Sequence, residues 1–432
     1  MRVVAVDVGS SAVKAAIFQD GRRVGGVVRE PVATRYEGRE VDMDADAVWA
    51  AFAAAVRLLG PEARSADRLA ADVLAPGFTA LTRSGEALSA VITHQDRRSW
   101  EQAAEIERRI GADRHLALVG CRPFPGGIAS SSLLWLRQNR PDAFAGADVF
   151  GQLSTFLNLR LTGAAVIDPG NASFLGLYDT FGMTGWHPEL CEALDVRPER
   201  LPEVRSGERI AGTLLPGPAD QLGLRSGTEV LTGVIDTTAA ICSTGAVPGR
   251  VFNSIGTTDV LAVVTDRPRP HEKVLTRCLG VGRLWVSVNT IAAGGGALAW
   301  VHRNLFADLD KAAFFGVVKE LAADPAPSPV RFEPYLAGDR LSLEPKTAAF
   351  TGLTLATGRR EMLKAVLDAW AELNARGLER IAERADPLPD VYVTGGGDEI
   401  AGALHARWPG SWRFHYLDEA ALLGMARLAA EG

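Results

Sequence analysis

Apolar residues follow two closely similar local patterns, one at the start of the chain and one just past its middle. Residues 3–18 form two apolar, β-branched runs separated by the turn Gly9-Ser10-Ser11. Residues 251–264 form two such runs separated by Gly256-Thr257-Thr258. Runs of this kind that are interrupted by glycine are typical of strand, tight turn and strand. The repeat predicts that each half of the chain opens with the same hairpin.

Helical periodicity accompanies these predicted strands. In residues 46–59, and again in residues 360–383, apolar side chains recur at the three- and four-residue spacing of one helix face. Strands and helices in both halves predict α/β domains with mixed sheets. The glycine- and proline-containing stretch 244–249 can end one unit and begin the next. We therefore predict two domains, residues 1–247 and 248–432.

Composition and charge narrow the functional classes. A chain of 432 residues exceeds the size of a single hydrophobic core, and 47% hydrophobic with 23% charged residues is a globular composition. A net charge of −6 without long Lys or Arg runs disfavours a nucleic-acid or anionic-membrane partner. The chain has no membrane-length apolar stretch, and Asp7 comes too early for a secretory signal, so we expect a cytoplasmic protein. Four widely spaced cysteines are expected to be reduced and buried.

The first turn carries residue types that suit a phosphate group and a divalent cation. Gly9 allows close backbone approach, turn amides can form an anion site, and the hydroxyls of Ser10 and Ser11 add donors. Asp7 stands at the end of the preceding strand and could hold a cation directly or through water, while Lys14 follows seven residues later. The alternative is an ordinary hairpin with a solvated aspartate.

Because the turn is duplicated, the two copies could face each other across a cleft and enclose the polyphosphate of a nucleotide. Gly395-Gly396-Gly397 follows a predicted strand and favours the same ligand, with a flexible loop as the alternative. Gly294-Gly295-Gly296 is either another wall of the pocket or a close helix contact. The chain has no G-x-x-x-x-G-K-[ST] and no G-x-G-x-x-G, which disfavours P-loop and standard dinucleotide-binding proteins.

Two polar segments are candidates for contact with a second substrate. Asp236 follows an apolar strand among small residues, and its carboxylate could accept a hydroxyl proton during phosphorylation. It could equally cap the helix that follows it. Residues 94–99, which include Asp96, offer paired donors and acceptors for polyol hydroxyls, or else a solvated helix start.

The chain resembles the FGGY carbohydrate kinases from Val3 almost to its C-terminus. The matching segments occur in the family's order: Asp7 to Ser11 with Lys14, Gln95 to Arg98, Leu133 to Asn139, Gly233 to Asp236, Ser254 to Thr258, Phe332 to Leu336, Gly338 to Arg340, Ala348 to Leu353 with Glu361 to Asp368, and Thr394 to Gly397. The resemblance implies an α/β, two-domain actin-like ATPase (ribonuclease H-like) fold with a cleft between the domains.

The same resemblance implies roles for individual residues. Asp236 would be the catalytic base and also contact the substrate, and Asp7 would lie beside Mg²⁺. The nucleotide and its phosphates would be bound by Gly9, Ser10, Ser11, Lys14, Gly256, Thr257, Thr258, Gly295, Gly396 and Gly397. Asp96 would contact substrate, as would Gly77 and Phe78, which stand where relatives carry a distinctive polar pair. The chain also departs from the family pattern at Ser132 and at Asp398-Glu399.

The function that these features predict is ATP- and Mg²⁺-dependent phosphorylation of a hydroxyl of a ketose, such as a pentulose like xylulose. The partners would be a small-molecule sugar and ATP, with a homodimer as a further possibility. The alternatives are a kinase for another sugar or polyol, or a catalytically inactive relative that senses a sugar or nucleotide.

Overall fold

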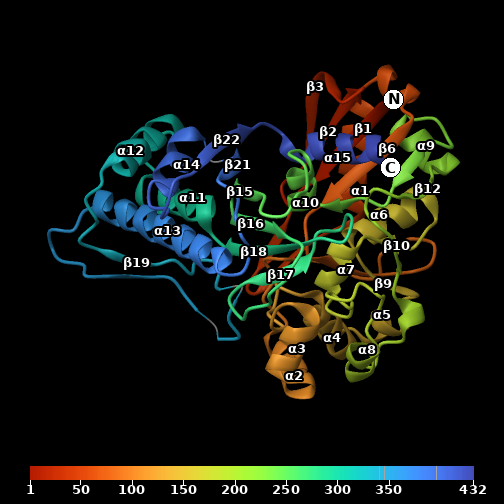
Figure 1. The fold of residues 1–432 in the computed structure, drawn as a ribbon, viewed down its shortest axis with the longest axis horizontal. Coiled ribbons are helices and arrows are strands. Elements are labelled where there is room, and N and C mark those ends of the chain that lie inside the picture. The colour runs from red at the N-terminus through yellow and green to blue at the C-terminus, as the bar shows by residue number, and fades with distance from the viewer. Residues whose placement is uncertain (340, 345, 396) are drawn as a thin grey trace.

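The computed structural model describes residues 1–339, 341–344, 346–395 and 397–432, apart from the side chains of residues 398 and 399. Two α/β lobes lie side by side, with most of the C-terminal half on the left of Figure 1 and the N-terminal half on the right. Each lobe is built around a mixed sheet with helices against it. The predicted class, α/β with two lobes, is confirmed.

The main sheet of the first lobe has the strand order β12-β13-β6-β1-β2-β3, and β14 also pairs with β6. A second sheet of this half has the order β4-β5-β8-β7-β9, and β10 pairs with β11. The strands are β1 (Arg2–Val8), β2 (Ala12–Gln19), β3 (Arg22–Pro31), β4 (Arg35–Glu37), β5 (Glu40–Met43), β6 (Arg68–Val73), β7 (Gly77–Leu81), β8 (Val91–Thr93), β9 (Val149–Gln152), β10 (Val166–Ile167), β11 (Glu203–Val204), β12 (Ile210–Thr213), β13 (Glu229–Leu231) and β14 (Val234–Ile235).

The helices of this half connect and cover these strands. They are α1 (Ala45–Leu58), α2 (Trp100–Ile110), α3 (Ala112–Val119), α4 (Ala129–Asn139), α5 (Pro141–Gly146), α6 (Leu153–Thr162), α7 (Pro169–Leu175), α8 (Pro188–Ala193), α9 (Pro216–Leu222) and α10 (Asp236–Cys242), with short 3₁₀ turns η1 (Pro61–Ser65) and η2 (Pro198–Arg200). The helix predicted over 46–59 is confirmed as α1. It begins after Asp44, whose carboxylate accepts a hydrogen bond from the Ala47 amide at 2.8 Å, an N-cap.

The second lobe repeats the connectivity of the first. Its sheet has the order β17-β18-β16-β15-β21-β22, and β15 runs antiparallel to β16 and parallel to β21, just as β1 runs antiparallel to β2 and parallel to β6. Both predicted hairpins and the predicted helix over 360–383 are confirmed. The elements are β15 (Val251–Ile255), β16 (Asp259–Thr265), β17 (Leu275–Cys278), β18 (Trp285–Ile291), β19 (Arg331–Glu333), β20 (Ala349–Thr351), β21 (Asp390–Gly395), β22 (Arg413–Leu417), α11 (Gly294–Leu305), α12 (Lys311–Ala323), α13 (Arg359–Ala382), α14 (Asp398–His405) and α15 (Ala420–Glu431).

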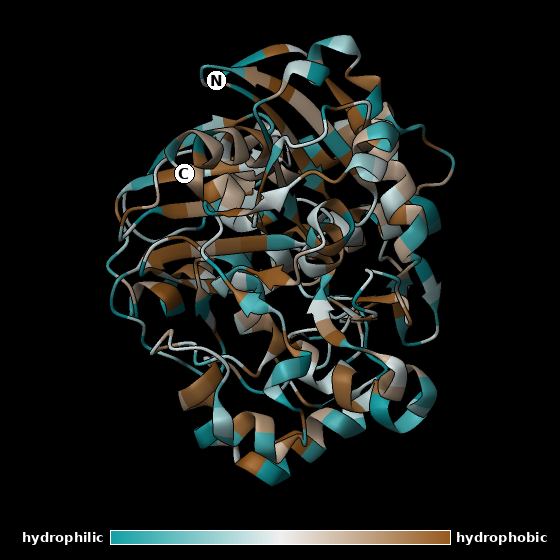
Figure 2. Cartoon of the chain, turned by 90° about the vertical axis from the view of Figure 1, so that its right-hand side faces the viewer, coloured by the Kyte–Doolittle hydropathy of each residue, from teal (hydrophilic) through white to brown (hydrophobic). Residues whose placement is uncertain are grey.

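Burial follows the apolar pattern of the sequence. Strand β1 has a neighbouring strand at each edge, and both of its faces are covered: Val4 and Val6 join one apolar cluster, and Val3 and Ala5 join another. Figure 2 shows hydrophobic stretches along the central strands, whereas the peripheral helices alternate between hydrophobic and hydrophilic residues. All four cysteines are buried and free, as expected.

The last helix returns to the first lobe. In Figure 1, α15 lies among the strands of the N-terminal sheet, where it packs against α10, β1 and β6. Residues 248–432 therefore do not all lie in the second lobe, and the division near residue 248 stays a prediction. The described part of the chain contains no candidate membrane-spanning helix.

Candidate active site

Three carboxylates meet at one edge of the first sheet. Asp7 near the end of β1 lies opposite Asp72 on the parallel strand β6. Strand β14 pairs with β6, and Val73 of β6 lies opposite Ile235 of β14. Asp236 is the next residue after Ile235. The carboxyl ends of parallel strands lie at the same sheet edge, which explains why distant parts of the sequence converge here. Burial and the negative charge of Asp236 both act to raise the pKa of Asp7 and of Asp72.

Lys14 partly offsets this negative charge. Its Nζ lies 3.5 Å from the Asp7 carboxylate and 2.6 Å from that of Glu419, which precedes α15. The Asp7 side chain keeps 15% of its surface exposed, whereas Asp72 is fully buried and, apart from the Asp7 carboxyl group, has no hydrogen-bond partner for its own carboxyl group in the described part of the chain. Asp7 is therefore the member of this pair that can reach a ligand.

Replacing Asp72 with Asn is expected to stabilise the ligand-free protein, and more so as the pH rises. Burial next to Asp7 raises the pKa of Asp72 well above 3.8. The folded protein therefore keeps a proton that the unfolded chain loses, and the contribution of Asp72 to stability falls as the pH rises above the unfolded pKa. Urea unfolding of both proteins at about pH 4.5 and about pH 7.5 measures the effect. A stability difference that is independent of pH would contradict it.

The first glycine turn leaves its hydroxyls available. The Gly9 amide donates to the Ala12 carbonyl at 3.1 Å, and the Ser10 carbonyl accepts from the Thr34 hydroxyl at 2.6 Å. Within the described residues, the hydroxyls of Ser10 and Ser11 have no hydrogen-bond partner, and Ser11 is exposed. The backbone of this turn is thus fixed by the protein while two donors remain free for a ligand.

The second glycine turn is held against the start of α11. The amides of Gly295 and Gly296 donate to the carbonyls of Gly256 and Thr257 at 2.9 and 3.0 Å. A Cβ atom at Gly295 would lie only 2.6 Å from the Gly256 carbonyl oxygen. Of the two interpretations of residues 294–296, the structure therefore shows the close helix contact directly. The contact also places the N-terminus of α11 beside the turn, so the phosphate-binding role of Gly295 stays a prediction.

Gly295→Ala is expected to raise the KM for ATP about tenfold or more while changing the KM for sugar little. The added methyl group must displace the turn, and positional errors of about 1 Å at a reacting group are costly. Gly316→Ala on α12 is the control, because its Cβ would meet no atom within 4 Å. Steady-state kinetics with each substrate varied in turn tests this. Equal effects on both KM values would show that the turn has no special relation to ATP.

The third glycine run lies next to the second turn. Gly395 at the end of β21 pairs with Ile255, the residue before Gly256, and has a φ of +73°. A Cβ atom there would lie 2.3 Å from the Ile255 carbonyl oxygen, so only glycine fits. Gly397 has a φ of +69° and precedes α14 as its N-cap, and Gly396 lies outside the described residues. Gly395 thus borders the second turn, and nucleotide binding by Gly396 and Gly397 stays a prediction.

Asp236 opens into a small cavity that both halves of the chain line. The cavity measures about 70 Å³, and Thr258 of the second turn is part of its wall. The Asp236 carboxylate accepts hydrogen bonds from the Thr237 amide at 2.5 Å and from the Thr237 hydroxyl at 3.0 Å, at the first turn of α10. The remaining lining residues are Ala75, His94, Phe174, Ile235, Val260, Leu275, Arg277, Val288 and Thr290.

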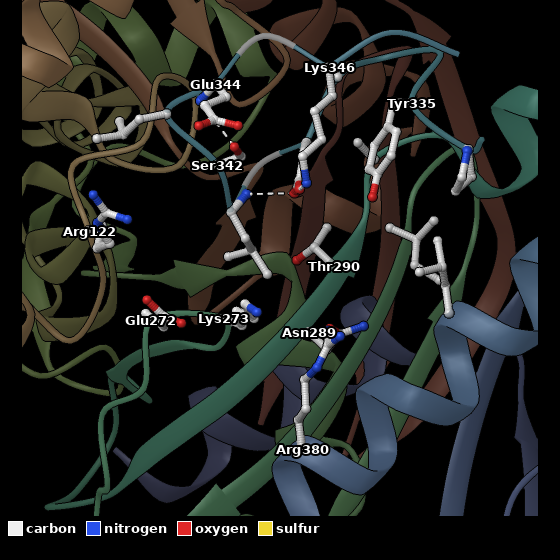
Figure 3. Close-up of a pocket in the computed structure, with 18 residues that line it drawn as sticks. Arg122, Glu272, Lys273, Asn289, Thr290, Tyr335, Ser342, Glu344, Lys346 and Arg380 are labelled. Carbon is white, nitrogen blue, oxygen red and sulfur yellow. Dashed lines mark hydrogen bonds and ion pairs between the residues drawn. The ribbon is translucent and has the colours of Figure 1, made fainter. Parts of the chain in front are cut away.

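A larger pocket of about 520 Å³ shares Thr290 with this cavity. Figure 3 shows Lys346 and Tyr335 on one side of this pocket and Asn289 and Arg380 on another, with Thr290 between them. Arg122 from the first half of the chain also lines it. The two hollows together form the predicted cleft between the lobes.

Three of the residues predicted to contact substrate, Gly77, Phe78 and Asp96, lie close in sequence to residues that line the cavity, but their own groups contact other parts of the protein. Phe78 is fully buried and stacks on Phe150, and the Gly77 amide donates to Gln152 Oε1 at 2.7 Å. Asp96 is 1% exposed and accepts hydrogen bonds from the amides of Val41 and Arg98 and from the Arg98 guanidinium. The cavity is lined instead by two of their neighbours, Ala75 and His94. Substrate contact by Gly77, Phe78 and Asp96 stays a prediction.

Two residues at the site were not predicted from the sequence. Asp72 and Arg277 each sit inside an apolar strand, with no motif around them. Only strand register could have placed Asp72 opposite Asp7, and only the docking of β17 near α7 places Arg277 in the wall of the cavity.

The donor set at the first turn suits Mg²⁺. Hard cations prefer oxygen ligands, and Mg²⁺ usually takes one or two carboxylates together with substrate phosphates and water. Asp7 supplies an accessible carboxylate beside the turn. Across the described ranges, no group of three or more His, Cys, Asp or Glu side chains could hold a metal by itself. A cation here would therefore depend on ligands from a bound nucleotide.

Comparison with known proteins gives the class of the molecule. Residues 2–243 match the N-terminal domain of the FGGY family of carbohydrate kinases, and residues 251–431 match its C-terminal domain. The protein is therefore a carbohydrate kinase, a phosphotransferase that acts on a sugar and uses ATP. It belongs to the FGGY family, which confirms the resemblance drawn from its motifs.

Individual relatives agree on the fold but differ in substrate. The chain is 25% identical over 402 residues to xylulose kinase from Escherichia coli, covering 91% of this chain and 81% of that protein. It is 24% identical over 331 residues to gluconokinase from Bacillus subtilis, covering 73% and 64%. The crystal structure of xylulose kinase from Rhodospirillum rubrum superposes with a TM-score of 0.86 at 21% identity, covering 100% of this chain and 89% of that one. The two-domain actin-like fold is confirmed.

Proposed function

We propose that the protein transfers the γ-phosphate of ATP, with Mg²⁺, to a hydroxyl of a ketose such as the pentulose xylulose. The observation that carries this proposal is the shared cavity in which Asp236 of the first lobe meets Thr258 of the second. The relatives named xylulose kinase, which the chain matches over 91% of its length, support a pentulose as the acceptor. A cytoplasmic location and a homodimer stay predictions.

Each part of the site has a chemical task in this proposal. Asp236 accepts the proton of the attacking hydroxyl. General-base catalysis of this kind typically increases the rate by about 10²–10⁴-fold. Donors from the turns at 9–11 and 256–258 hold the phosphates in line, with the Lys14 ammonium nearby, and most of the rate of phosphoryl transfer comes from such positioning and charge neutralisation. Asp7 would hold Mg²⁺, which neutralises phosphate charge when bound. Closure of the lobes would exclude water that otherwise hydrolyses ATP.

A coupled assay of ADP formation with a panel of ketoses, polyols and aldoses tests the proposal. Saturable ADP formation that depends on a pentulose supports it. Saturation with a polyol or another sugar alone would replace the acceptor but keep the reaction. Heat stabilisation by sugar or ATP without any turnover would contradict the proposal and support a sensing role.

A further inference from the structure

Arg277 is a buried cation in the wall of the Asp236 cavity. It lies on β17, is 4% exposed, and belongs to the second half of the chain. Strand β17 is nevertheless tied to the first lobe, since the Thr276 amide donates to the Gly120 carbonyl at 3.0 Å and the Cys278 amide to the Ser173 hydroxyl at 3.2 Å. Arg277 therefore has a fixed place in the same wall as Asp236.

The protein satisfies only one end of the Arg277 guanidinium. Nη1 donates to the Thr238 hydroxyl and to the Cys278 carbonyl, both at 3.1 Å. Thr238 lies in α10, which begins at Asp236, and its hydroxyl donates in turn to the Leu279 carbonyl at 2.6 Å. The guanidinium carbon also lies 5.5 Å from the centre of the Phe174 ring. Nε and Nη2 have no acceptor among the described residues.

Neither Nε nor Nη2 is sealed in the protein interior, and Arg277 lines the cavity that Asp236 also lines, so this edge of the guanidinium is available to a ligand. The Nε and Nη2 atoms form a planar fork that matches two neighbouring oxygen atoms lying in one plane. A carboxylate offers such a pair, as does a carbonyl beside a hydroxyl in an open-chain ketose. Two neighbouring hydroxyls of a polyol can also face the fork, but they are twisted about their C–C bond and are weaker acceptors, so they fit it less well.

We propose that Arg277 selects the acceptor by binding two neighbouring, coplanar oxygen atoms through Nε and Nη2. This inference rests on the function proposed above. The acceptor is then either a ketose, bound by its carbonyl and adjacent hydroxyl, or a sugar acid, bound by its carboxylate. Polyols of the same length bind less well. The hydrogen bond from Nη1 to Thr238 fixes the fork relative to α10, and therefore relative to Asp236, the first residue of that helix.

The test uses three acceptors of five carbons: xylulose, xylonate and xylitol. Wild-type kcat/KM for xylulose or for xylonate is expected to exceed that for xylitol by about tenfold or more, because the twisted hydroxyls of the polyol make weaker hydrogen bonds to the fork. If kcat/KM is higher for xylonate, the oxygen pair is a carboxylate. If it is higher for xylulose, the pair is a carbonyl and its adjacent hydroxyl. Equal values for all three acceptors would overturn the proposal without any variant.

Arg277→Met is expected to raise the KM of the preferred acceptor about 10- to 100-fold, to leave the KM for ATP within about twofold, and to abolish the preference over xylitol. Arg277→Lys keeps the charge but not the fork, and is expected to recover activity only partly. Arg200→Met is the matched control, since Arg200 donates to backbone carbonyls of Phe144 and Ala147 within the first lobe. It should leave the acceptor preference unchanged.

Two kinds of failure are distinguishable. If neither the Met nor the Lys variant changes the ratio between acceptors, Arg277 has only a structural role and this inference is wrong. If Arg277→Met does not fold, the wild-type panel and the Lys variant still decide the question. If the wild type forms no ADP with any sugar, the proposed function itself fails.

Discussion

Asp236→Asn is expected to lower sugar-dependent ADP formation by about 10²–10⁴-fold while leaving ATP affinity nearly unchanged. The amide has almost the same shape, so it can still accept the hydrogen bonds from the Thr237 amide and hydroxyl that fix this position at the start of α10. It has no basic oxygen for the hydroxyl proton. The loss should therefore appear in kcat rather than in the KM for ATP. Steady-state kinetics together with calorimetric titration of ATP separates these two quantities.

Asp195→Asn is the matched control for this variant. The Asp195 side chain is 75% exposed, and its carboxylate pairs with Arg137, away from the cavity. Its turnover should equal that of the wild type. If Asp236→Asn keeps its turnover, or loses ATP binding together with turnover, Asp236 is not the base.

Asp259→Ala is expected to cost about 3 kcal/mol or more of the free energy of unfolding. Asp259 follows the second glycine turn and is 1% exposed. Its carboxylate accepts a hydrogen bond from Asn253 of β15 at 2.7 Å. It also accepts from Trp370 at 2.7 Å and Asn374 at 2.6 Å, which tie the turn to α13. Removing it leaves three buried donors without their acceptor, and each such donor costs about 1–3 kcal/mol.

This network lies directly behind the turn. The variant should therefore lose more of its affinity for ATP than of its affinity for sugar. Urea unfolding followed by fluorescence measures stability, and ligand titration measures the two affinities. Asp310→Ala is the control: Asp310 only caps α12, by accepting from the Ala313 amide, so its loss should cost about 1 kcal/mol. A loss at Asp259 no larger than that at Asp310 would show that the network contributes little.

The local features of the fold were predictable because short segments determine them. Both hairpins, the strand before Gly395 and the helices α1 and α13 follow from apolar periodicity and from glycine positions. The duplicated connectivity could also be anticipated from the repeated Gly-hydroxyl turn. By contrast, the packing of α15 on the first sheet depends on contacts between the two ends of the chain, which no local pattern encodes.

The candidate site divides in the same way. The turns and Asp236 were predictable because they are parts of motifs. Asp72 and Arg277 were not, because register and strand docking place them, and an acid or an arginine inside an apolar strand gives no local signal. Asp96 shows the converse: its polar segment was recognised, but burial directs its carboxylate to Val41 and Arg98, while His94 lines the cavity.

The proposed mechanism requires turns from the two lobes to hold one nucleotide with its terminal phosphate facing Asp236. A crystal structure of the protein with a non-hydrolysable ATP analogue, Mg²⁺ and a sugar measures this most directly. We expect the phosphates between residues 9–11 and 256–258, the cation beside Asp7, and a sugar hydroxyl within hydrogen-bond distance of Asp236 and in line with the γ-phosphate. A nucleotide bound away from either turn, or a sugar remote from Asp236, would contradict it.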